Sequence, residues 1–408
     1  MASIRDSVSI IDVYNTYMGT KYSLDYVKRN NVKCPFHDDA KASARIYLDT
    51  NTLFCFSCNK HFSPVKFIQE YTKCTSEEAK QIACTIGGIE YKAKAPLTEE
   101  EKNFYKIYEY VAGLFHFICT DDYFSKRGFS NDIIKKYKLG FCPTVFNVKF
   151  SDRPVTLKEL LMSQFKDISE ETLDSFQLYD FKGVSKYAER YIFPIFDKYG
   201  RVVGFTGRAK GDAEPKYYNT PGSVKFFDKK NLLYNYHVAI ESPLVYVVEG
   251  TADALSLISA GITNVVAPLG TAFTDEHLKL LSGKQIVLSL DNDKAGLNTM
   301  YKLIVNNPDI HFSVLLLKGY KDFNEALVAG VNLKDIVKVS KTMSAVDFLI
   351  YSWKKAYDLS ILSNRVSLCR KVESLLTSGH YHWLEVYYYN KILRKLFTKI
   401  TEEDLKDE

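Results

Sequence analysis

The sequence has few cysteines and no long apolar run. Eight cysteines among 408 residues are too sparse for a disulfide scaffold. The opening stretch MASIRDSVSI has no apolar core typical of a signal peptide. No apolar run approaches the roughly 20 residues that a bilayer-spanning helix needs. We therefore expect no membrane partner and a location in the reducing cytoplasm, where paired cysteines more often bind metal than each other.

The sequence also lacks the Walker-type pattern G-x-x-x-x-G-K-[ST], internal repeats and long low-complexity tracts. The first absence argues against a P-loop motor. Hydrophobic residues make up 46% and charged residues 25%, the balance of a globular protein, and the length suggests two to four domains. A net charge of +5 is compatible with nucleic-acid binding but does not establish it.

The stretch CPFHDDAKASARIYLDTNTLFCFSC begins at Cys34 and contains two pairs of metal-type ligands. In each pair two residues separate the ligands, which lets a tight turn present both to one ion. Alternating apolar and polar residues over 44–56 predict a β-hairpin that returns the second pair to the first. We therefore predict a closed Cys3His zinc ribbon. The alternative is three buried or reactive thiols beside a surface histidine. The predicted zinc ligands are Cys34, His37, Cys55 and Cys58.

Three aromatic residues, Phe54, Phe56 and Phe62, flank the predicted ligands. They could stack bases, as aromatic side chains do in single-strand binding. Packing in the core of a small domain explains each of them at least as well.

The chain divides by pattern into three predicted parts. A polar stretch at 89–102 reads as a linker, and Thr98 with Glu101 forms a capping-box signature that starts a helix to about residue 119. The predicted fold is a multidomain α/β protein, with an α+β subdomain and then a doubly wound, mainly parallel sheet. The predicted domains are 1–92 (zinc ribbon), 99–340 (divided into a basic subdomain, 99–242, and a sheet subdomain, 243–330) and 341–408 (a helical C-terminal module).

The sheet prediction rests on a regular alternation that begins at residue 243. Four buried-type strands each precede a helical segment, which predicts parallel strands with crossover helices. The predicted strands are 244–249, 263–268, 285–291 and 312–318.

Acidic residues follow three of these strands. In a doubly wound sheet, ligands bind beyond the carboxyl ends of the strands. Clustered carboxylates repel one another unless cations lie between them, and Mg²⁺ prefers hard oxygen ligands. We predict a catalytic Mg²⁺ or Mn²⁺ site, against the alternative of ordinary solubilising loop acids. Asp253 either supports this site or is a surface charge. The predicted ligands are Glu249, Asp291, Asp293 and Asp322.

Basic residues gather before the sheet. The segment 190–222 predicts a β-hairpin that turns at 198–200 and whose second arm ends at Arg208. Arg grips phosphate with two parallel hydrogen bonds, whereas Lys acts as a point charge. Isolated basic residues are most often solvated surface residues, and these gain weight only together with the acids. The candidate phosphate-binding residues are Arg127, Arg208, Lys216, Lys229 and Lys230.

Taken in order, these motifs resemble the DnaG-type DNA primases of bacteria and phages. The zinc pattern appears as CPFH and CFSC, and a polymerase-domain motif as SKRGFSNDIIKKYKLGFCP. A basic motif appears as IFPIFDKYGRVVGFTGRAKGDAEPKYYNTP, and the Toprim motifs appear as VVEGTADAL, APLGTAFT, LSLDNDKAG and KDFNEAL. The resemblance covers roughly residues 1–330.

The resemblance implies a primase that synthesises short RNA primers on single-stranded DNA from ribonucleoside triphosphates by two-metal chemistry. It implies that Glu249, Asp291, Asp293 and Asp322 bind the catalytic metal. It also implies that Arg127, Arg208, Lys216 and Lys229 bind nucleotide or template phosphates. The implied partners are single-stranded DNA, ribonucleoside triphosphates, the RNA primer–DNA hybrid and a replicative helicase, which family members contact through a C-terminal helical module. The compact length suggests a phage or mobile-element version.

The sequence departs from the family pattern at several positions. Asn324 stands where the family often has Asp, which bears on metal occupancy, and Phe323 stands where it often has Pro. The usual E-G-Y-M-D reads E-G-T-A-D, and the usual E-K-T-P-S-F is reduced to DAKASARI, which bears on template preference. Two rival functions stay open: a non-catalytic DNA-binding accessory protein, and another Toprim enzyme such as a nuclease or topoisomerase.

Overall fold

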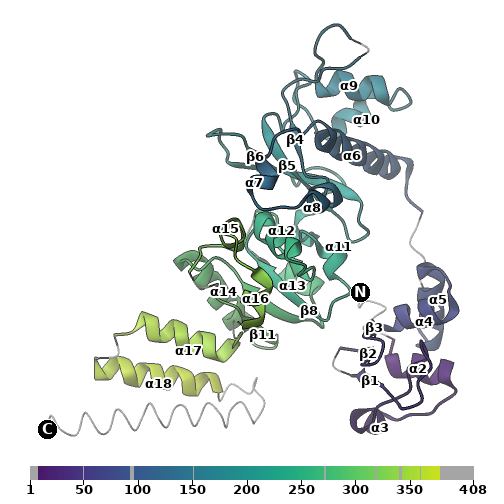
Figure 1. Cartoon of the computed structure of the whole chain (residues 1–408), viewed down its shortest axis with the longest axis vertical. Coiled ribbons are helices and arrows are strands. Elements are labelled where there is room, and N and C mark those ends of the chain that lie inside the picture. The colour runs from purple at the N-terminus through teal and green to yellow at the C-terminus, as the bar shows by residue number, and fades with distance from the viewer. Residues whose placement is uncertain are drawn as a thin grey trace. The chain divides into compact units, whose positions relative to one another are not determined.

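The computed structural model shows a chain of two compact units, Met1–Leu97 and Thr98–Glu408 (Figure 1). The division lies within the predicted linker. The structure describes residues 8–48, 50–91, 96–149, 151–270, 273–317, 319–339, 342–358 and 360–376. None of the helices in these ranges is long and apolar enough to cross a membrane.

The first unit is built on a three-stranded antiparallel sheet with the order β1-β2-β3. β1 (Ala44–Tyr47) and β2 (Thr52–Cys55) form the predicted hairpin, and Asn51 adopts a positive φ of 50° in its turn. The third strand, β3 (Lys60–Phe62), is too short for its pattern to show in the sequence. The described part of this unit also contains the helices α2 (Ile10–Met18), α3 (Leu24–Arg29), α4 (Pro64–Thr72) and α5 (Ser76–Ile86).

The second unit opens with α6 (Glu99–Phe117), which begins at the predicted capping box. The Thr98 hydroxyl accepts a hydrogen bond from the Glu101 N–H (3.2 Å), and the Glu101 carboxylate accepts one from the Thr98 N–H (2.8 Å). α6 packs on a sheet with the order β4-β5-β6-β7, in which β5 and β6 form the predicted hairpin. The strands are β4 (Gly140–Cys142), β5 (Arg190–Phe196), β6 (Val202–Ala209) and β7 (Tyr217–Asn219).

Short helices precede, connect and follow the strands of this subdomain. They are α7 (Tyr123–Lys126), α8 (Asn131–Lys136), α9 (Leu157–Gln164), α10 (Glu170–Ser175), the 3-10 helix η1 (Lys229–Asn231) and α11 (Tyr236–Ala239). Every residue of β5 is buried, so this strand forms the centre of the subdomain core.

The predicted parallel sheet follows, with the strand order β12-β11-β10-β8-β9. β8, β9, β10 and β11 run parallel, and β12 is antiparallel at the edge. β9 and β11 are shorter than predicted. β9 pairs with β8 only at Val265 and Val266, and β11 pairs with β10 only as far as Val314 and then continues as irregular backbone. The strands are β8 (Leu244–Val248), β9 (Val265–Val266), β10 (Gln285–Ser289), β11 (Phe312–Val314) and β12 (Met343–Ser344).

The chain reverses its direction of winding at β8. From β8 it moves to β9 on one side, and it then returns to place β10 on the other side. This switch point, between the carboxyl ends of β8 and β10, is where open α/β sheets bind ligands. The helices that follow the strands are α12 (Thr251–Ser259), α13 (Asp275–Leu280), α14 (Lys294–Asn306), α15 (Phe323–Val328) and α16 (Leu333–Val339).

The predicted helical C-terminal module begins as a continuation of this sheet. α17 (Ala345–Ala356) packs on α14 and β11, and its Trp353 belongs to the same apolar cluster as the sheet. α18 (Leu362–Leu376) packs on α17. The rest of the predicted module, residues 377–408 with Trp383, lies outside the described residues.

Candidate functional site

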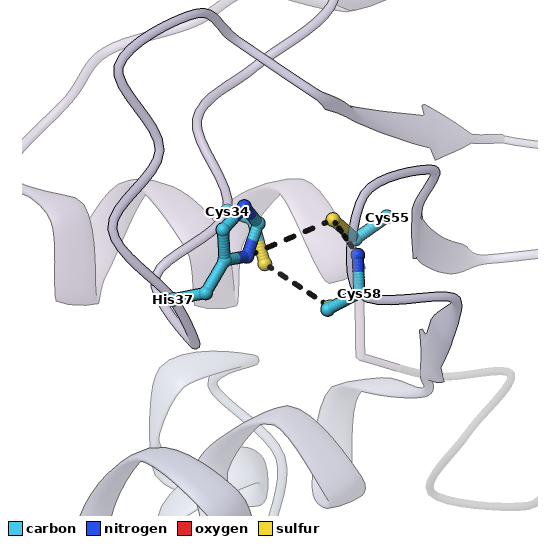
Figure 2. A group of neighbouring side chains, drawn as sticks. All are labelled: Cys34, His37, Cys55 and Cys58. Carbon is cyan, nitrogen blue, oxygen red and sulfur yellow. Dashed lines mark hydrogen bonds between the residues drawn. The ribbon is translucent and has the colours of Figure 1, made fainter.

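The four predicted zinc ligands lie together in the first unit (Figure 2). Cys34 and His37 come from the loop before β1, whereas Cys55 ends β2 and Cys58 lies in the turn to β3. One candidate ligand atom from each residue lies within 4.8 Å of the others. The Sγ atoms of Cys34 and Cys58 are 4.0 Å apart, close to the roughly 3.8 Å expected for two thiolates on one tetrahedral zinc. The donor set therefore fits a structural zinc ion.

Two residues of the altered DAKASARI stretch support this cluster. The Asp39 carboxylate accepts hydrogen bonds from the N–H groups of Cys34 (2.7 Å) and Ser43 (3.0 Å). The pKa of Asp39 lies below its usual value, mainly because the Cys34 N–H donates to it. Asp39 also lies 3.8 Å from His37 Nε2, and the Ser43 hydroxyl lies 3.5 Å from the same nitrogen. Asp39 and Ser43 thus hold the zinc ligands in position. The family pattern did not predict this role for them.

Replacing Asp39 with Asn is expected to weaken zinc binding by about 10- to 100-fold, the usual effect of losing a group that orients a ligand. One oxygen of Asp39 accepts from both loop N–H groups and the other faces His37, so the amide keeps the first contact and loses the negative charge beside His37. Zinc affinity would be measured by competition with a chromophoric chelator. Asp38→Asn is the matched control, because Asp38 is the exposed neighbour with the same charge. Equal affinities in the two variants would contradict this role.

The three aromatic residues near the cluster have different environments. Phe62 is buried and stacks on Phe36, with ring centroids 4.0 Å apart, so it is a core residue. Phe56 is 56% exposed and meets the half-buried Phe54 edge to face at 5.1 Å. Base stacking therefore remains open for Phe54 and Phe56 only.

In the second unit, two predicted acids meet at the switch point. β8 and β10 pair in register up to Val248 opposite Ser289, so Glu249 and Asp291 both follow at the same edge. The backbone N–H of Asp291 donates to the Glu249 carboxylate over 3.2 Å. The pairing of β8 with β10 brings these two residues together, although 42 positions separate them in the sequence.

The other two predicted acids begin helices beside this edge. Asp293 caps α14, where it accepts from the N–H groups of Ala295 and Gly296 at 2.9 Å. Asp322 caps α15 and accepts from the Glu325 N–H at 2.7 Å. Each cap fixes its carboxylate at a helix N-terminus.

Asp253, which the sequence left undecided, is a buried member of this group. Its carboxylate accepts from the N–H groups of Phe323 (3.0 Å) and Asn324 (3.3 Å), so it holds the start of α15 against α12. Burial, reinforced by Asp322 and Asp291, raises its pKa to about 8. Asp253 is therefore not a surface charge.

Burial and neighbouring carboxylates dominate the electrostatics of the edge. Burial raises the pKa of Asp291 to about 6, and the carboxylates of Glu249 and Asp322 add to the effect. Within the described ranges, the Cys/His group is the only cluster whose ligand atoms are compact enough to hold an ion as they stand. The acids share one edge without forming so tight a group.

The glycine of the LSLDNDKAG motif, Gly296, lies too close to the backbone of Asp291 to carry a side chain. A Cβ atom at this position would lie 2.1 Å from the carbonyl oxygen of Asp291. Gly296→Ala must therefore push the end of β10 and Asp291 aside, and we expect it to destabilise the second unit by about 1–3 kcal/mol.

Thermal unfolding of the full chain would measure this loss. Gly113→Ala, in α6 with open space around it, is the control and should be neutral or slightly stabilising. A Gly296→Ala variant as stable as the wild type would contradict the close approach.

Two of the predicted basic residues lie beside one aromatic ring. The guanidinium carbons of Arg127 and Arg208 lie 5.5 and 5.8 Å from the centre of the Tyr123 ring. Arg127 Nη1 also donates to Asn324 Oδ1 over 2.8 Å, which ties this arginine to α15, next to Asp322. Asn324 therefore faces Arg127. The amide that stands where the family often has a carboxylate contacts an arginine of the basic subdomain.

The remaining candidates lie elsewhere on the basic subdomain. Lys216 is exposed in the loop before β7, and Lys229 is half-buried in η1, which packs on α13. Burial lowers the pKa of Lys229. Lys230 is exposed in the same helix. Among the contacts of the described residues, none joins these lysines to the acids, so their part in the site stays a prediction.

Comparison with known proteins agrees with the order of these parts. Three family models match: the CHC2 zinc finger over residues 1–99, the N-terminal domain of the DNA primase catalytic core over 118–240, and a Toprim-like domain over 246–327. The fold and the two clusters thus define a zinc-finger protein with a Toprim-containing primase core.

Relatives and solved structures point the same way. The DNA primase of Helicobacter pylori is 31% identical over 370 residues, which cover 87% of this chain and 64% of that protein. The DNA primase of Thermotoga maritima is 30% identical, with 87% and 63% covered. A crystal structure of Aquifex aeolicus primase, with its zinc-binding and RNA polymerase domains, is 25% identical with a TM-score of 0.55, and covers 98% of this chain and 97% of that one.

The chain belongs to the family of DnaG-type DNA primases. It spans slightly less than two thirds of the length of the two bacterial relatives named above.

Proposed function

We propose that this chain is a DNA primase, a DNA-directed RNA polymerase that makes short RNA primers on single-stranded DNA from ribonucleoside triphosphates. The observation that carries the proposal is the meeting of Glu249 and Asp291 at the switch point of a Toprim-like sheet. Family membership supports it, and so does a solved DnaG catalytic domain bound to single-stranded DNA, which is 24% identical and shares the fold.

In this proposal the acids of the edge hold the catalytic metal. Four carboxylates offer the hard oxygen donors that suit Mg²⁺ or Mn²⁺, and a bound cation would relieve the repulsion of Glu249 and Asp322 that, after burial, contributes to the raised pKa of Asp291. The ion would neutralise charge on the transferred phosphate and activate the attacking hydroxyl. Glu249 and Asp291 would bind it, and the helix caps would orient Asp293 and Asp322.

The basic residues would hold the phosphates. Arg127 and Arg208 both lie beside the ring of Tyr123, and we assign them to the nucleotide triphosphate or the template backbone. Lys216 and Lys229 would extend this contact along the template and the primer–DNA hybrid. Such contacts weaken as salt concentration rises.

The zinc unit would contact the template. Its exposed Phe56 and half-buried Phe54 offer rings on which bases could stack. We further propose that the segment after residue 340 contacts a replicative helicase, as the family's C-terminal module does. The protein would then act in the bacterial cytoplasm, encoded by the host or by a phage.

Synthesis of labelled RNA on single-stranded DNA, with ribonucleotides and Mg²⁺, tests the proposal. Short RNA products are expected, and their absence with and without a helicase, while DNA binding persists, would favour the accessory-protein alternative. DNA cleavage or relaxation without ribonucleotides would favour another Toprim enzyme. The accessory-protein alternative rests on Asn324, which stands where the family often has Asp, and the contact of Asn324 with Arg127 supports a role for this amide within the proposed primase.

A further inference from the structure

We propose that Asn324 is a positioning residue that holds Arg127 in place while leaving its positive charge free for phosphate. The inference rests on the proposed function, in which Arg127 binds phosphate groups. It concerns a position at which this chain carries an amide where its family often carries a carboxylate.

Asn324 binds Arg127 at two points. Its Oδ1 accepts from the guanidinium (2.8 Å), and its Nδ2 donates to the main-chain carbonyl of the same residue (3.0 Å). Nδ2 also donates to the Ser256 hydroxyl on α12 over 3.0 Å. Asn324 is buried, and its own N–H donates to Asp253. One amide thus joins the turn after α7 to α12 and α15, across 197 positions of sequence.

A carboxylate could not make the same contacts. An ionised Asp has no donor, so it would set an oxygen against the carbonyl of Arg127. It would also form an ion pair with the guanidinium and cancel much of its charge. It would further add a negative charge beside Asp253 and Asp322, where burial and neighbouring carboxylates already raise the pKa of Asp253. The neutral amide avoids all three effects.

A separate contact fixes the same turn. Gly128, with a φ of +81°, packs so closely on α15 that a Cβ atom would lie 2.9 Å from the Leu327 side chain. The main chain at Arg127 and Gly128 is therefore held against α15 at two points. Its guanidinium, half-buried and over the ring of Tyr123, makes no ion pair with any carboxylate in the described part of the chain. The guanidinium is therefore held in place without a carboxylate partner among the described residues.

Asn324→Asp tests this inference. We expect a variant that folds and shows dissociation constants for phosphate ligands at least about tenfold higher, the effect of losing a hydrogen bond to a charged group. Binding of ATP with Mg²⁺ and binding of a single-stranded oligonucleotide over a range of salt concentrations would be measured separately. A selective loss of ATP binding assigns Arg127 to the nucleotide, and a reduced salt slope for DNA assigns it to the template.

Arg127→Ala and the double variant make the test specific. If Asn324 acts through Arg127, the double variant should bind no more weakly than Arg127→Ala alone. Asn332→Asp is the matched control: Asn332 caps α16 in the same unit, and Asp serves equally well there, so its affinities should match the wild type.

Unchanged affinities in Asn324→Asp, or additive losses in the double variant, would overturn the inference alone, since the wild type would still bind its ligands and make primers. A wild-type chain that binds neither ATP nor DNA would overturn the proposed function, and this inference with it.

Discussion

Asp291→Asn is expected to reduce primer synthesis by at least about a hundredfold. Asp291 follows β10 at the switch point, where its N–H contacts Glu249 and its pKa is raised by burial and by neighbouring carboxylates. A site of this kind supplies several kcal/mol of charge stabilisation in metal-assisted phosphoryl chemistry, and each 1.4 kcal/mol is a tenfold change in rate. Asn keeps the shape and the backbone hydrogen bond but removes the charge.

The measurement is the initial rate of labelled primer synthesis on single-stranded DNA, together with Mn²⁺ affinity. Asp335→Asn, on the exposed face of α16, makes the same change of charge in the same unit and should keep the wild-type rate. Glu249→Gln should fall with Asp291→Asn. Near-normal synthesis by both variants would refute the assignment of the acids.

Cys55→Ser is expected to release zinc and to unfold the first unit. Cys55 is fully buried at the end of β2, and Cys34, another predicted ligand, belongs to the same small apolar cluster. Structural zinc contributes an apparent 10–16 kcal/mol in zinc-finger peptides, which exceeds the stability of most small domains. The variant should therefore lose almost all of its zinc and almost all of the folded structure of the first unit.

Zinc content and limited proteolysis of the full chain would measure this effect. We expect rapid cleavage within residues 1–97, while the second unit, which has its own core, stays resistant. Cys74→Ser is the control, because this half-buried thiol lies between α4 and α5 and outside the metal cluster. A Cys55→Ser variant that keeps one zinc and its protease resistance would contradict the predicted site.

Local pattern was sufficient to predict several features of this protein. The hairpin of the zinc ribbon follows from alternation around a turn, and the start of α6 follows from Thr98 and Glu101 three residues later. The parallel sheet follows from strands that alternate with helices. Each of these signals lies within a short stretch of chain, so the physical preferences of neighbouring residues reveal it.

One strand was too short to be predicted in this way: β3 has three residues, too few to display a period. The predicted strand at 263–268 is present, but only its two central residues pair, as β9. The extent of β11 is set by its pairing with β10, not by the apolar run that contains it. Sheet pairing depends on a partner strand that is distant in sequence.

The sequence by itself determined the ligand types, the order of the parts and the strand ends that carry Glu249 and Asp291. Only the tertiary structure decided the roles of Asp253, Asn324 and Asp39. Asp253 and Asn324 act on residues of distant segments, and Asp39 acts on the backbone of a folded loop. A side chain's partner is chosen by packing, and packing between segments far apart in the chain leaves no periodic trace in the sequence.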